Sequence, residues 1–301
     1  MDVLLGIFIR VILPVAVMTL VGYVAARWMP FDLKSLARLG LYVLVPCMTF
    51  TAMARTTLSA TEFAQILLLY ALSIPVLWGV SALSARALRL DAGATSAFHI
   101  SILFTNCVNV GFPVLALAYG ADAVERGVVY SIGMQVLLQS LGVYLAARGK
   151  TTLRASLTRM WRMPGLWALV AGLAVNAAHI TIPPPIFEPL KLIGDSLVSF
   201  LLLVLGMQLA SVSLRGQWRA ATVATVIRLG VAPVVSVALA GWLGLSPLTR
   251  QATILENSMP TAIFGVALAQ EFDVAPELIT TIIFLTTLAS MFSLTILIAV
   301  L

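Results

Sequence analysis

Long apolar runs separated by short polar segments recur along the whole chain. Each run is close to the roughly 20 residues that an α-helix needs to cross the hydrocarbon core of a bilayer. The predicted spans, numbered 1 to 10 in chain order, are Leu4–Arg27, Leu36–Met53, Phe63–Leu88, Ser96–Tyr119, Val124–Ala147, Gly165–Ile180, Leu190–Val212, Ala220–Leu243, Gln251–Gln270 and Pro276–Leu301. The pattern therefore predicts an all-α polytopic membrane protein with ten transmembrane helices.

The composition agrees with this pattern and limits where a function can lie. Hydrophobic residues make up 61% of the 301 residues and charged residues only 10%, whereas soluble proteins contain about 25% charged residues. The segments between the spans are short, and the longest of them follows span 5. No soluble catalytic or binding domain is expected, so the function must be carried by the membrane helices.

The basic residues predict the orientation in the membrane. The connections between spans 1–2, 3–4, 5–6, 7–8 and 9–10, with the helix ends beside them, hold twelve Lys and Arg residues, and the opposite side holds four. Because basic residues concentrate in cytoplasmic loops, the protein is expected in the cell membrane with both termini outside and the basic segment 148–163 in the cytoplasm. This asymmetry explains the net charge of +6, so no nucleic-acid partner is expected.

The same basic segment divides the chain into two five-span repeats, residues 1–150 and 151–301. The fourth span of each half has a central proline, Pro113 or Pro260. Similar segments follow the two prolines: Leu117-Ala-Tyr-Gly-Ala-Asp122 and Leu268-Ala-Gln-Glu-Phe-Asp273. An odd number of spans per repeat places the halves in opposite orientations, as in the inverted repeats of secondary transporters.

The two central prolines predict broken helices. A proline inside a helix removes a backbone donor and clashes with the preceding turn, and such a break is tolerated at membrane depth only inside protein or beside a water-filled cavity. Paired breaks in two repeats indicate a binding site near the midplane, where half-helix N-termini favour an anionic group. The predicted substrate-binding residues around the breaks are Asn106, Asn109, Gly111, Pro113, Asn257, Ser258 and Pro260. The alternative for the polar members of this set is hydrogen bonding between helices.

Two charged residues fall within predicted spans near the second break. Arg228 lies inside span 8, and Glu256 precedes Pro260 by four residues. Ionisable residues inside a membrane are costly and mark functional sites by default. The pair is expected to contact each other, either as a structural ion pair or as a site of ion coupling. In the second case Glu256 would bind a proton or Na⁺, and no other metal or cofactor is expected.

Several of these segments resemble the auxin efflux carrier family. The similar residues are Thr105-Asn106, Gly111-Phe-Pro113 and Tyr119-Gly120 in and after span 4, with Met259-Pro260 in span 9 and Leu205-Gly-Met-Gln208 in span 7. The resemblance covers essentially the whole chain, although the basic central segment is much shorter than in the plant members. It implies the crossover fold of bile-acid symporters, with spans 1, 2, 6 and 7 as a scaffold and spans 3–5 and 8–10 as a transport domain. It also implies that Asn106 binds a substrate carboxylate.

The predicted function is that of a secondary active transporter of small organic anions, such as auxin-like or dicarboxylate compounds, working by an elevator-type mechanism. The scaffold helices would supply the interface of a homodimer. The chain has no G-x-G-x-x-G segment, P-loop or metal-ligand spacing, so an enzyme is not expected. A sodium-coupled symporter of the bile-acid type is the first alternative, followed by a channel and by a membrane sensor.

Overall fold

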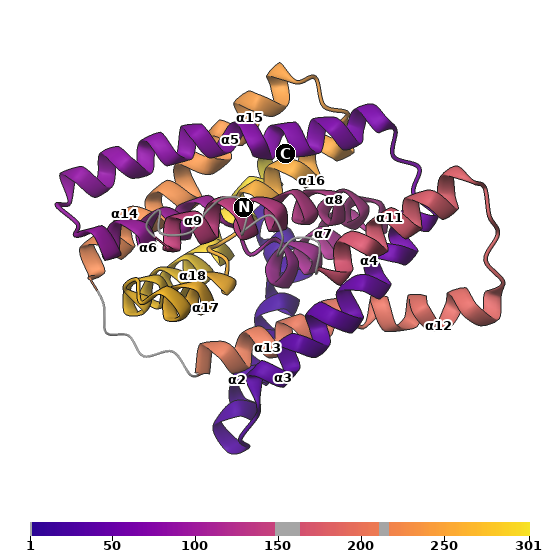
Figure 1. Ribbon diagram of the computed structural model, residues 1–301, viewed down its shortest axis with the longest axis horizontal. Helices are drawn as coiled ribbons and strands as arrows, with labels where there is room; N and C mark the ends of the chain where they lie inside the picture. The colour runs from indigo at the N-terminus through magenta and orange to yellow at the C-terminus, as the bar shows by residue number, and fades with distance from the viewer. Residues whose placement is uncertain (1, 148–162, 211–216) are drawn as a thin grey trace.

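The computed structural model describes residues 2–147, 163–210 and 217–301, and this part of the chain is helical apart from short connections (Figure 1). The helices before the basic segment are α1 (Asp2–Ile7), η1 (Phe8–Ile12), α2 (Leu13–Trp28), α3 (Leu33–Leu39), η2 (Gly40–Leu44), α4 (Val45–Ala54), α5 (Ala60–Ala87), α6 (Ala92–Leu103), η3 (Cys107–Gly111), α7 (Phe112–Tyr119), α8 (Ala121–Leu137), η4 (Leu138–Gly142) and α9 (Val143–Ala146). Those after it are α11 (Pro164–Ala177), α12 (Pro184–Asp195), α13 (Leu197–Ala210), α14 (Trp218–Val226), η5 (Ile227–Val231), α15 (Ala232–Trp242), α16 (Pro247–Asn257), α17 (Phe264–Phe272) and α18 (Pro276–Val300).

Within the described residues, seven helical stretches are long and apolar enough to cross a membrane: Asp2–Trp28, Leu33–Ala54, Ala60–Ala87, Ala121–Ala146, Pro184–Ala210, Trp218–Trp242 and Pro276–Val300. They correspond to predicted spans 1, 2, 3, 5, 7, 8 and 10. Shorter helices stand at the places of the other three spans, with a single helix at span 6 and two pieces each at spans 4 and 9. The multi-helix membrane architecture is thus confirmed, while the count of ten crossings stays a prediction.

The largest error in a predicted boundary is at the start of span 7. Span 7 was expected to begin at Leu190, but α12 begins at Pro184. Proline fits the first turn of a helix because the N–H it lacks has no intrahelical acceptor there, so this proline-rich segment starts a helix. The predicted basic loop 148–163 lies outside the described residues except for Met163.

Prolines also shape the long helices. Four of the π-helical turns, η1, η2, η3 and η5, are each followed by a proline at the second position of the next α-helical segment. These prolines are Pro14, Pro46, Pro113 and Pro233. A proline ring would clash with the carbonyl four residues earlier, and a widened turn makes room for it. Such π-helical turns frequently occur at functional sites, and η3 and η5 lie at the site described below.

The helices pack in two groups. In the first group α2 packs along α13, and α4 packs against α11 and α12. In the second, α5 contacts α6, α8 and α15, α18 contacts α6 and α14, and α16 lies between α8 and α15. Figure 1 shows α2, α3 and α13 at the lower centre and α4, α11 and α12 toward the right, with α5, α15, α14 and α6 of the second group above and to the left. The division into a scaffold of spans 1, 2, 6 and 7 and a transport domain of spans 3–5 and 8–10 stays a prediction.

Glycines allow the first group to pack with its backbones close together. A side-chain carbon on Gly22 of α2 would overlap the Leu203 carbonyl of α13, and one on Gly206 of α13 would overlap the Thr19 carbonyl of α2. At the other crossing in this group, a carbon on Gly172 of α11 would lie 2.8 Å from the Phe50 carbonyl oxygen of α4. Small residues at helix crossings are typical of membrane proteins, in which packing replaces the hydrophobic effect as the force between helices.

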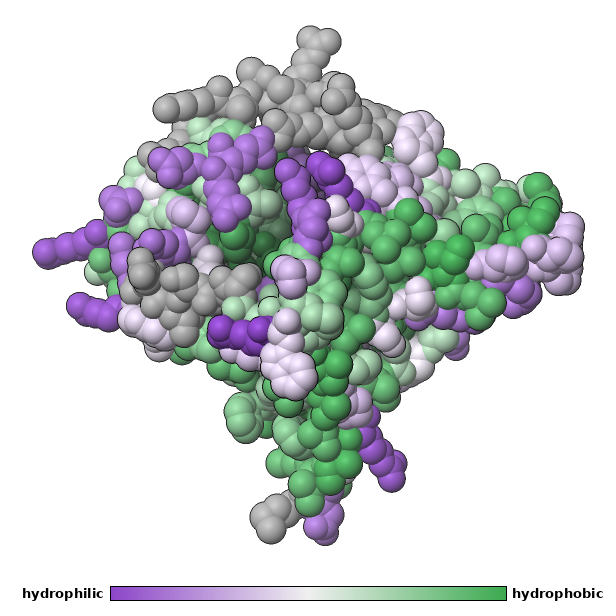
Figure 2. Space-filling model, turned by 90° about the horizontal axis from the view of Figure 1, so that it is seen from below, coloured by the Kyte–Doolittle hydropathy of each residue, from purple (hydrophilic) through white to green (hydrophobic). Residues whose placement is uncertain are grey.

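The outer surface suits a lipid environment. Large hydrophobic side chains are exposed along the first helical stretch, among them Leu5, Ile9, Val17, Leu20 and Val24. Figure 2 shows hydrophobic residues over much of one face, with hydrophilic residues gathered toward the left of the view. In water such a surface would drive aggregation, whereas acyl chains would cover it in a bilayer.

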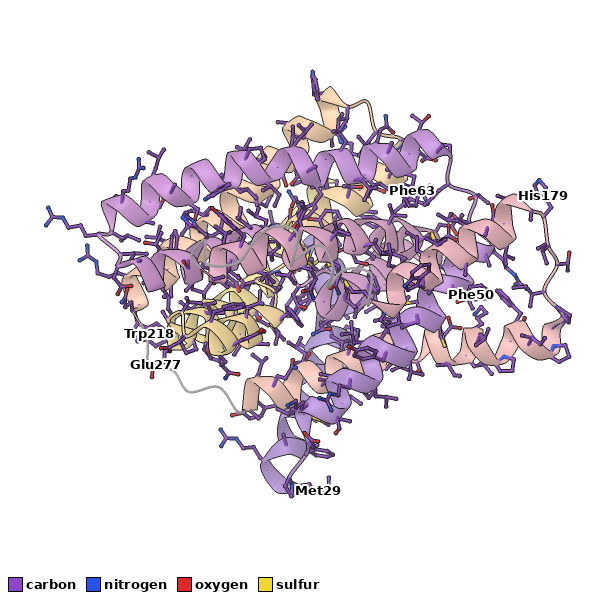
Figure 3. The ribbon with its side chains drawn as sticks, in the orientation of Figure 1. Met29, Phe50, Phe63, His179, Trp218 and Glu277 are labelled. Atoms are coloured by element: carbon purple, nitrogen blue, oxygen red, sulfur yellow. The ribbon has the colours of Figure 1, made fainter. Side chains whose placement is uncertain are left out.

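Connections far apart in the sequence lie at the same end of the molecule. Figure 3 places Trp218 and Glu277, at or next to the starts of α14 and α18, together at the left. Phe63 and His179, near the connections between spans 2–3 and 6–7, lie toward the right, and Met29, between spans 1 and 2, lies at the bottom of the view.

We predict that Gly206→Ala lowers the thermal unfolding temperature of the detergent-solubilised protein, because the new methyl group would overlap the Thr19 carbonyl. Overpacking of this kind costs about 1–3 kcal/mol. Gly79→Ala in α5 is the matched control, since nothing lies within 4 Å of its added carbon. Equal unfolding temperatures for the two variants would contradict this account of the α2–α13 crossing.

Candidate functional site

Two interrupted helices meet in the centre of the second helix group. The first, α6, ends at Leu103, and the chain resumes a helix at Cys107. The second, α16, ends at Asn257, and α17 begins at Phe264. The breaks predicted near Pro113 and Pro260 are therefore present, although the first one lies several residues before Pro113, which itself falls at the second position of α7.

The two breaks are joined by a short antiparallel backbone bridge between Thr105 and Thr261. The Asn106 N–H donates to the Pro260 carbonyl at 2.7 Å, and the Ala262 N–H donates to the Phe104 carbonyl at 3.0 Å. Each break thus supplies hydrogen-bond partners that the other needs, which is the requirement for irregular backbone at membrane depth.

Threonine side chains complete the backbone pairing. The Thr261 hydroxyl donates to the Ser101 carbonyl at 2.8 Å, near the end of α6. The Thr261 N–H in turn donates to the Thr286 hydroxyl of α18 at 3.2 Å. The crossover of the two broken helices is therefore held by backbone and hydroxyl groups from three helices.

Arg228 is completely buried beside this crossover, on the π-helical turn η5. Its Nε donates to the Met259 carbonyl at 3.1 Å and its Nη1 to the Ile102 carbonyl at 2.6 Å, while Nη2 donates to the Asn257 carbonyl. These carbonyls belong to the C-terminal ends of α6 and α16 and to the second break. The guanidinium thus sits where the negative ends of two helix dipoles meet.

Glu256 is also completely buried, but it does not pair with Arg228, so the predicted contact between the two residues is wrong. Within the described residues, neither carboxyl oxygen of Glu256 has a hydrogen-bond partner. The carboxyl group lies instead against two glycines, because an added carbon on Gly127 would come within 2.6 Å of its Oε1, and one on Gly111 would overlap the group. The sequence did not reveal that Arg228 donates to backbone carbonyls instead of pairing with Glu256, because no sequence pattern shows which carbonyls converge.

Asn257 and Ser258 have their side chains engaged by the protein itself. The Asn257 Oδ1 accepts from the Tyr130 hydroxyl at 2.7 Å and from the Ser73 hydroxyl at 3.4 Å, and its Nδ2 donates to the Ser236 hydroxyl at 2.7 Å. The Ser258 hydroxyl donates back to the Ile254 carbonyl at 2.6 Å. These contacts favour hydrogen bonding between helices for Asn257 and within α16 for Ser258, rather than substrate binding.

Asn106 differs from Asn257 in having an unused donor. The residue is only 5% exposed, and its Nδ2 has no hydrogen-bond partner. The neighbouring Thr105 hydroxyl is buried without a partner as well. Asn109 lies half-buried on η3, where Gly111 makes room for the Glu256 carboxyl. Buried polar atoms without partners call for an explanation, and a ligand or ion at the crossover would supply one.

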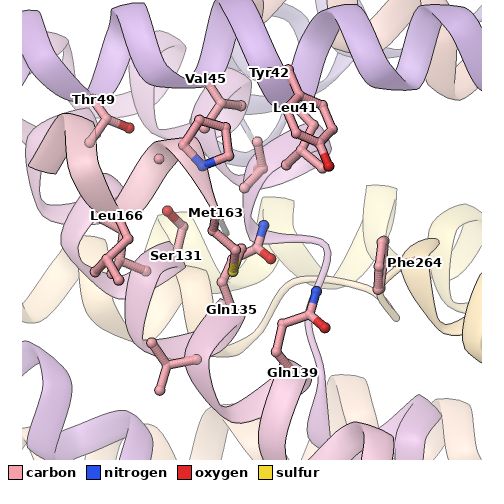
Figure 4. Close-up of a pocket in the computed structure, with 15 residues that line it drawn as sticks. Leu41, Tyr42, Val45, Thr49, Ser131, Gln135, Gln139, Met163, Leu166 and Phe264 are labelled. Carbon is pink, nitrogen blue, oxygen red and sulfur yellow. The ribbon is translucent and has the colours of Figure 1, made fainter. Parts of the chain in front are cut away.

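A cavity of about 320 Å³ lies beside the crossover, between the two helix groups. Val108 of η3 and Phe264, the first residue of α17, line it from the crossover side. The opposite wall comes from span 2 and from the start of α11 (Figure 4). The polar lining residues are Tyr42, Thr49, Ser131, Gln135 and Gln139. None of the predicted substrate-binding residues lines the cavity. Two lining residues, Val108 and Phe264, nevertheless belong to the two interrupted helices around which the substrate-binding residues were predicted.

Gln135 and Gln139 were missed by the sequence analysis. They are four residues apart in span 5, so they share one face of α8 and η4, and Figure 4 shows both amides at the centre of the cavity. Two amide side chains four residues apart inside an apolar run indicate a polar face on that helix. The predicted site was chosen from prolines and charged residues within the spans. Uncharged polar residues on span 5, for which no break was predicted, were not considered.

The arrangement can bind a small anionic or polar molecule. The described lining residues carry amides, hydroxyls and apolar side chains, and none of these described residues is Lys, Arg, Asp or Glu. Phe264, the first residue of α17, lines the cavity, so the positive end of that helix dipole lies beside it. A carboxylate could therefore be held by the helix end and neutral donors, while the apolar lining contacts the rest of the molecule.

Comparison with known proteins agrees with this architecture. A family model described as "Membrane transport protein" matches the chain twice, over residues 7–149 and 148–298. A protein named as an uncharacterized transporter from Methanothermobacter thermautotrophicus is 28% identical over 288 residues, covering 94% of this chain and 95% of the relative. A second such transporter, from Methanocaldococcus jannaschii, is 23% identical over 297 residues, covering 93% of this chain and 94% of the relative.

We predict that Asn257→Ala destabilises the protein by about 2 kcal/mol, because the buried Tyr130 hydroxyl loses its acceptor. The loss is measured by thermal unfolding. In a double-mutant cycle with Tyr130→Phe, the two losses should be clearly less than additive. Asn109→Ala, at a half-buried position, is the control and should change stability little. Additive losses would show that the Asn257 network is not what stabilises this region.

Proposed function

The chain belongs to the membrane transport protein family, in agreement with the expected kinship to the auxin efflux carriers, and from this premise we propose that it is a secondary active transporter of small organic anions. The observation that carries the proposal is the crossover of two broken helices beside a cavity between two helix groups. Broken helices that cross at a binding site are typical of transporters that work by alternating access.

We propose further that the two halves are inverted repeats of five spans. The repeated match of the family model to each half supports this. The helix contacts support it as well, because they recur when the halves are exchanged. The contact of α2 with α13, spans 1 and 7, corresponds to that of α11 with α4, spans 6 and 2. Likewise the contact of α16 with α8 corresponds to that of α6 with α18.

In the proposed elevator mechanism, spans 1, 2, 6 and 7 form a scaffold that can dimerise, and spans 3–5 and 8–10 carry the substrate past it. The position of the cavity supports this mechanism, since one wall belongs to each group. Binding at such a boundary lets a rigid-body displacement expose the site first to one side of the membrane and then to the other.

The contacts between the two helix groups support a state in which the cavity is open toward the cytoplasm. The cavity is lined by the start of α11, directly after the basic segment that the positive-inside rule places in the cytoplasm. At the other end, the Thr56 hydroxyl donates to Glu125 at 3.1 Å and joins the end of span 2 to α8. The Asn176 amide of α11 donates to the Ala54 and Thr56 carbonyls at 3.2 and 3.1 Å and orders the same segment.

Glu256 is the proposed site of ion coupling. An unpaired carboxylate in a buried site costs several kcal/mol, and neither oxygen has a partner among the described residues. Binding of a proton or of Na⁺ would remove this cost. Because Glu256 packs against Gly111 on the first broken helix, occupancy of the carboxyl can affect the segment that also carries Asn106.

The proposed transport function is tested with purified protein in proteoliposomes. We expect saturable uptake of a radiolabelled carboxylate and acceleration of that uptake by unlabelled substrate on the other side of the membrane. Conduction without saturation or counterflow would contradict a carrier and favour a channel. Binding without movement would contradict transport and favour a sensor.

In the same assay, Asn106→Ala should weaken substrate binding by roughly tenfold to a hundredfold, the loss expected for a charge-assisted hydrogen bond of about 1.5–3 kcal/mol. The unfolding temperature of the free protein should stay near that of the wild type, because the Asn106 Nδ2 makes no hydrogen bond within the protein. Gln65→Ala is the control, since that amide binds the Leu243 carbonyl away from the cavity. Unchanged affinity in Asn106→Ala would remove this residue from the site.

We predict that Glu256→Gln abolishes the dependence of uptake on the coupling ion, because the amide can neither release a proton nor offer a carboxylate to a cation. Uptake is measured across pH, with Na⁺ replaced by choline in a parallel series. Glu277→Gln, at an exposed position at the start of α18, is the control. Strict Na⁺ dependence of the wild type would favour the sodium-coupled alternative. An ion dependence that Glu256→Gln leaves unaltered would contradict a coupling role for this residue.

A further inference from the structure

The carbonyl groups around Arg228 converge from two helix ends. Ile102 is next to the last residue of α6, Asn257 is the last residue of α16, and Met259 lies in the break that follows. All three carbonyl oxygens accept hydrogen bonds from one guanidinium, which is 0% exposed. No described Asp or Glu forms a salt bridge with Arg228, and the carboxyl oxygens of the nearby Glu256 have no hydrogen-bond partner.

The charge on Arg228 is therefore balanced by backbone dipoles. Each helix C-terminus carries about half a negative charge, and the ends of α6 and α16 together offset about one positive charge. A buried arginine without this compensation would cost several kcal/mol. Conversely, two helix C-termini that face each other in an apolar interior would repel without a cation between them.

Clusters of backbone carbonyls at unwound helix ends are also the ligands that transporters use to hold cations. We propose that the Arg228 guanidinium is a tethered cation that fills such a carbonyl site at the crossover. The site then has no room for an exchangeable ion, and the two half-helix ends stay joined. It follows, if the proposed transport function is correct, that a coupling ion has to bind elsewhere, at Glu256.

Arginine suits this role better than lysine does. A planar guanidinium presents donors in several fixed directions, and here Nε, Nη1 and Nη2 each reach a different carbonyl. The widened turn η5, which precedes Pro233, carries the side chain at this point. Arg228 is thus a positioning residue, which acts by holding the crossover in place.

The experiment is chemical rescue of Arg228→Ala, followed by thermal unfolding in detergent at constant ionic strength. The buffer contains choline, Na⁺ or a low, non-denaturing concentration of guanidinium. We expect the variant to have a lower unfolding temperature than the wild type in choline and to regain part of the difference in guanidinium or Na⁺. The gain is measured relative to the wild type, whose own guanidinium fills the site, so that any stabilisation by Na⁺ bound at Glu256 is subtracted. Gly206→Ala, destabilised at a distant helix crossing, controls for general effects of the ions and should gain no more than the wild type does.

A wild-type unfolding temperature for Arg228→Ala would overturn the proposal, and so would a loss that neither cation reverses. If Arg228→Ala yields no folded protein, Arg228→Lys and Arg228→Met decide the question. These side chains have similar lengths, but only lysine keeps the positive charge, so we expect Arg228→Lys to be the more stable. Equal behaviour of the two, whether both fold or neither does, would show that the carbonyls do not require a cation. These outcomes are measured without substrate and are independent of the transport assay.

Discussion

The need to satisfy backbone groups inside a membrane is the constraint on which this structure depends. Two helices are interrupted in the middle of the molecule, and each interruption leaves N–H and carbonyl groups that cannot form hydrogen bonds with lipid chains. The bridge between Thr105 and Thr261 pairs one break with the other. The breaks must therefore occur together and at the same depth, and this requirement is why a proline-broken helix in one half is matched by one in the other.

The two buried charged residues at the crossover, Arg228 and Glu256, differ in whether they have hydrogen-bond partners. Arg228 is held by three carbonyls and compensates the helix ends, so its charge belongs to the architecture. Glu256 is equally buried but has no partner in the described chain. Of these two charged residues, Arg228 has hydrogen-bond partners that join the broken helices, whereas Glu256 has none and is the proposed site of ion coupling.

The sequence predicted much of this fold but little of the detail of its site. Hydrophobic runs located the membrane helices because lipid demands continuous apolar length, and Pro113 and Pro260 indicated the breaks because proline opposes helix locally. The binding of Arg228 to carbonyls could not be predicted, since every residue has a carbonyl and only the fold decides which ones converge. The role of Asn257 depends in the same way on Ser73, Tyr130 and Ser236, which lie on three other helices.

The packing also indicates where a rearrangement can take place. The crossover is fastened within the second helix group by backbone pairing, by Arg228 and by Thr286 of α18, and the first group is fastened by close backbone contacts at Gly22 and Gly206. The cavity lies at the boundary between the groups. Across this boundary the Thr56 hydroxyl donates a hydrogen bond to Glu125. Contacts between the described parts of the two groups do exist, among them those of α13 with η3 and of α4 with α8, but they are fewer than the contacts within either group. The proposed displacement of one group along the other would therefore disrupt less packing than a rearrangement inside either group.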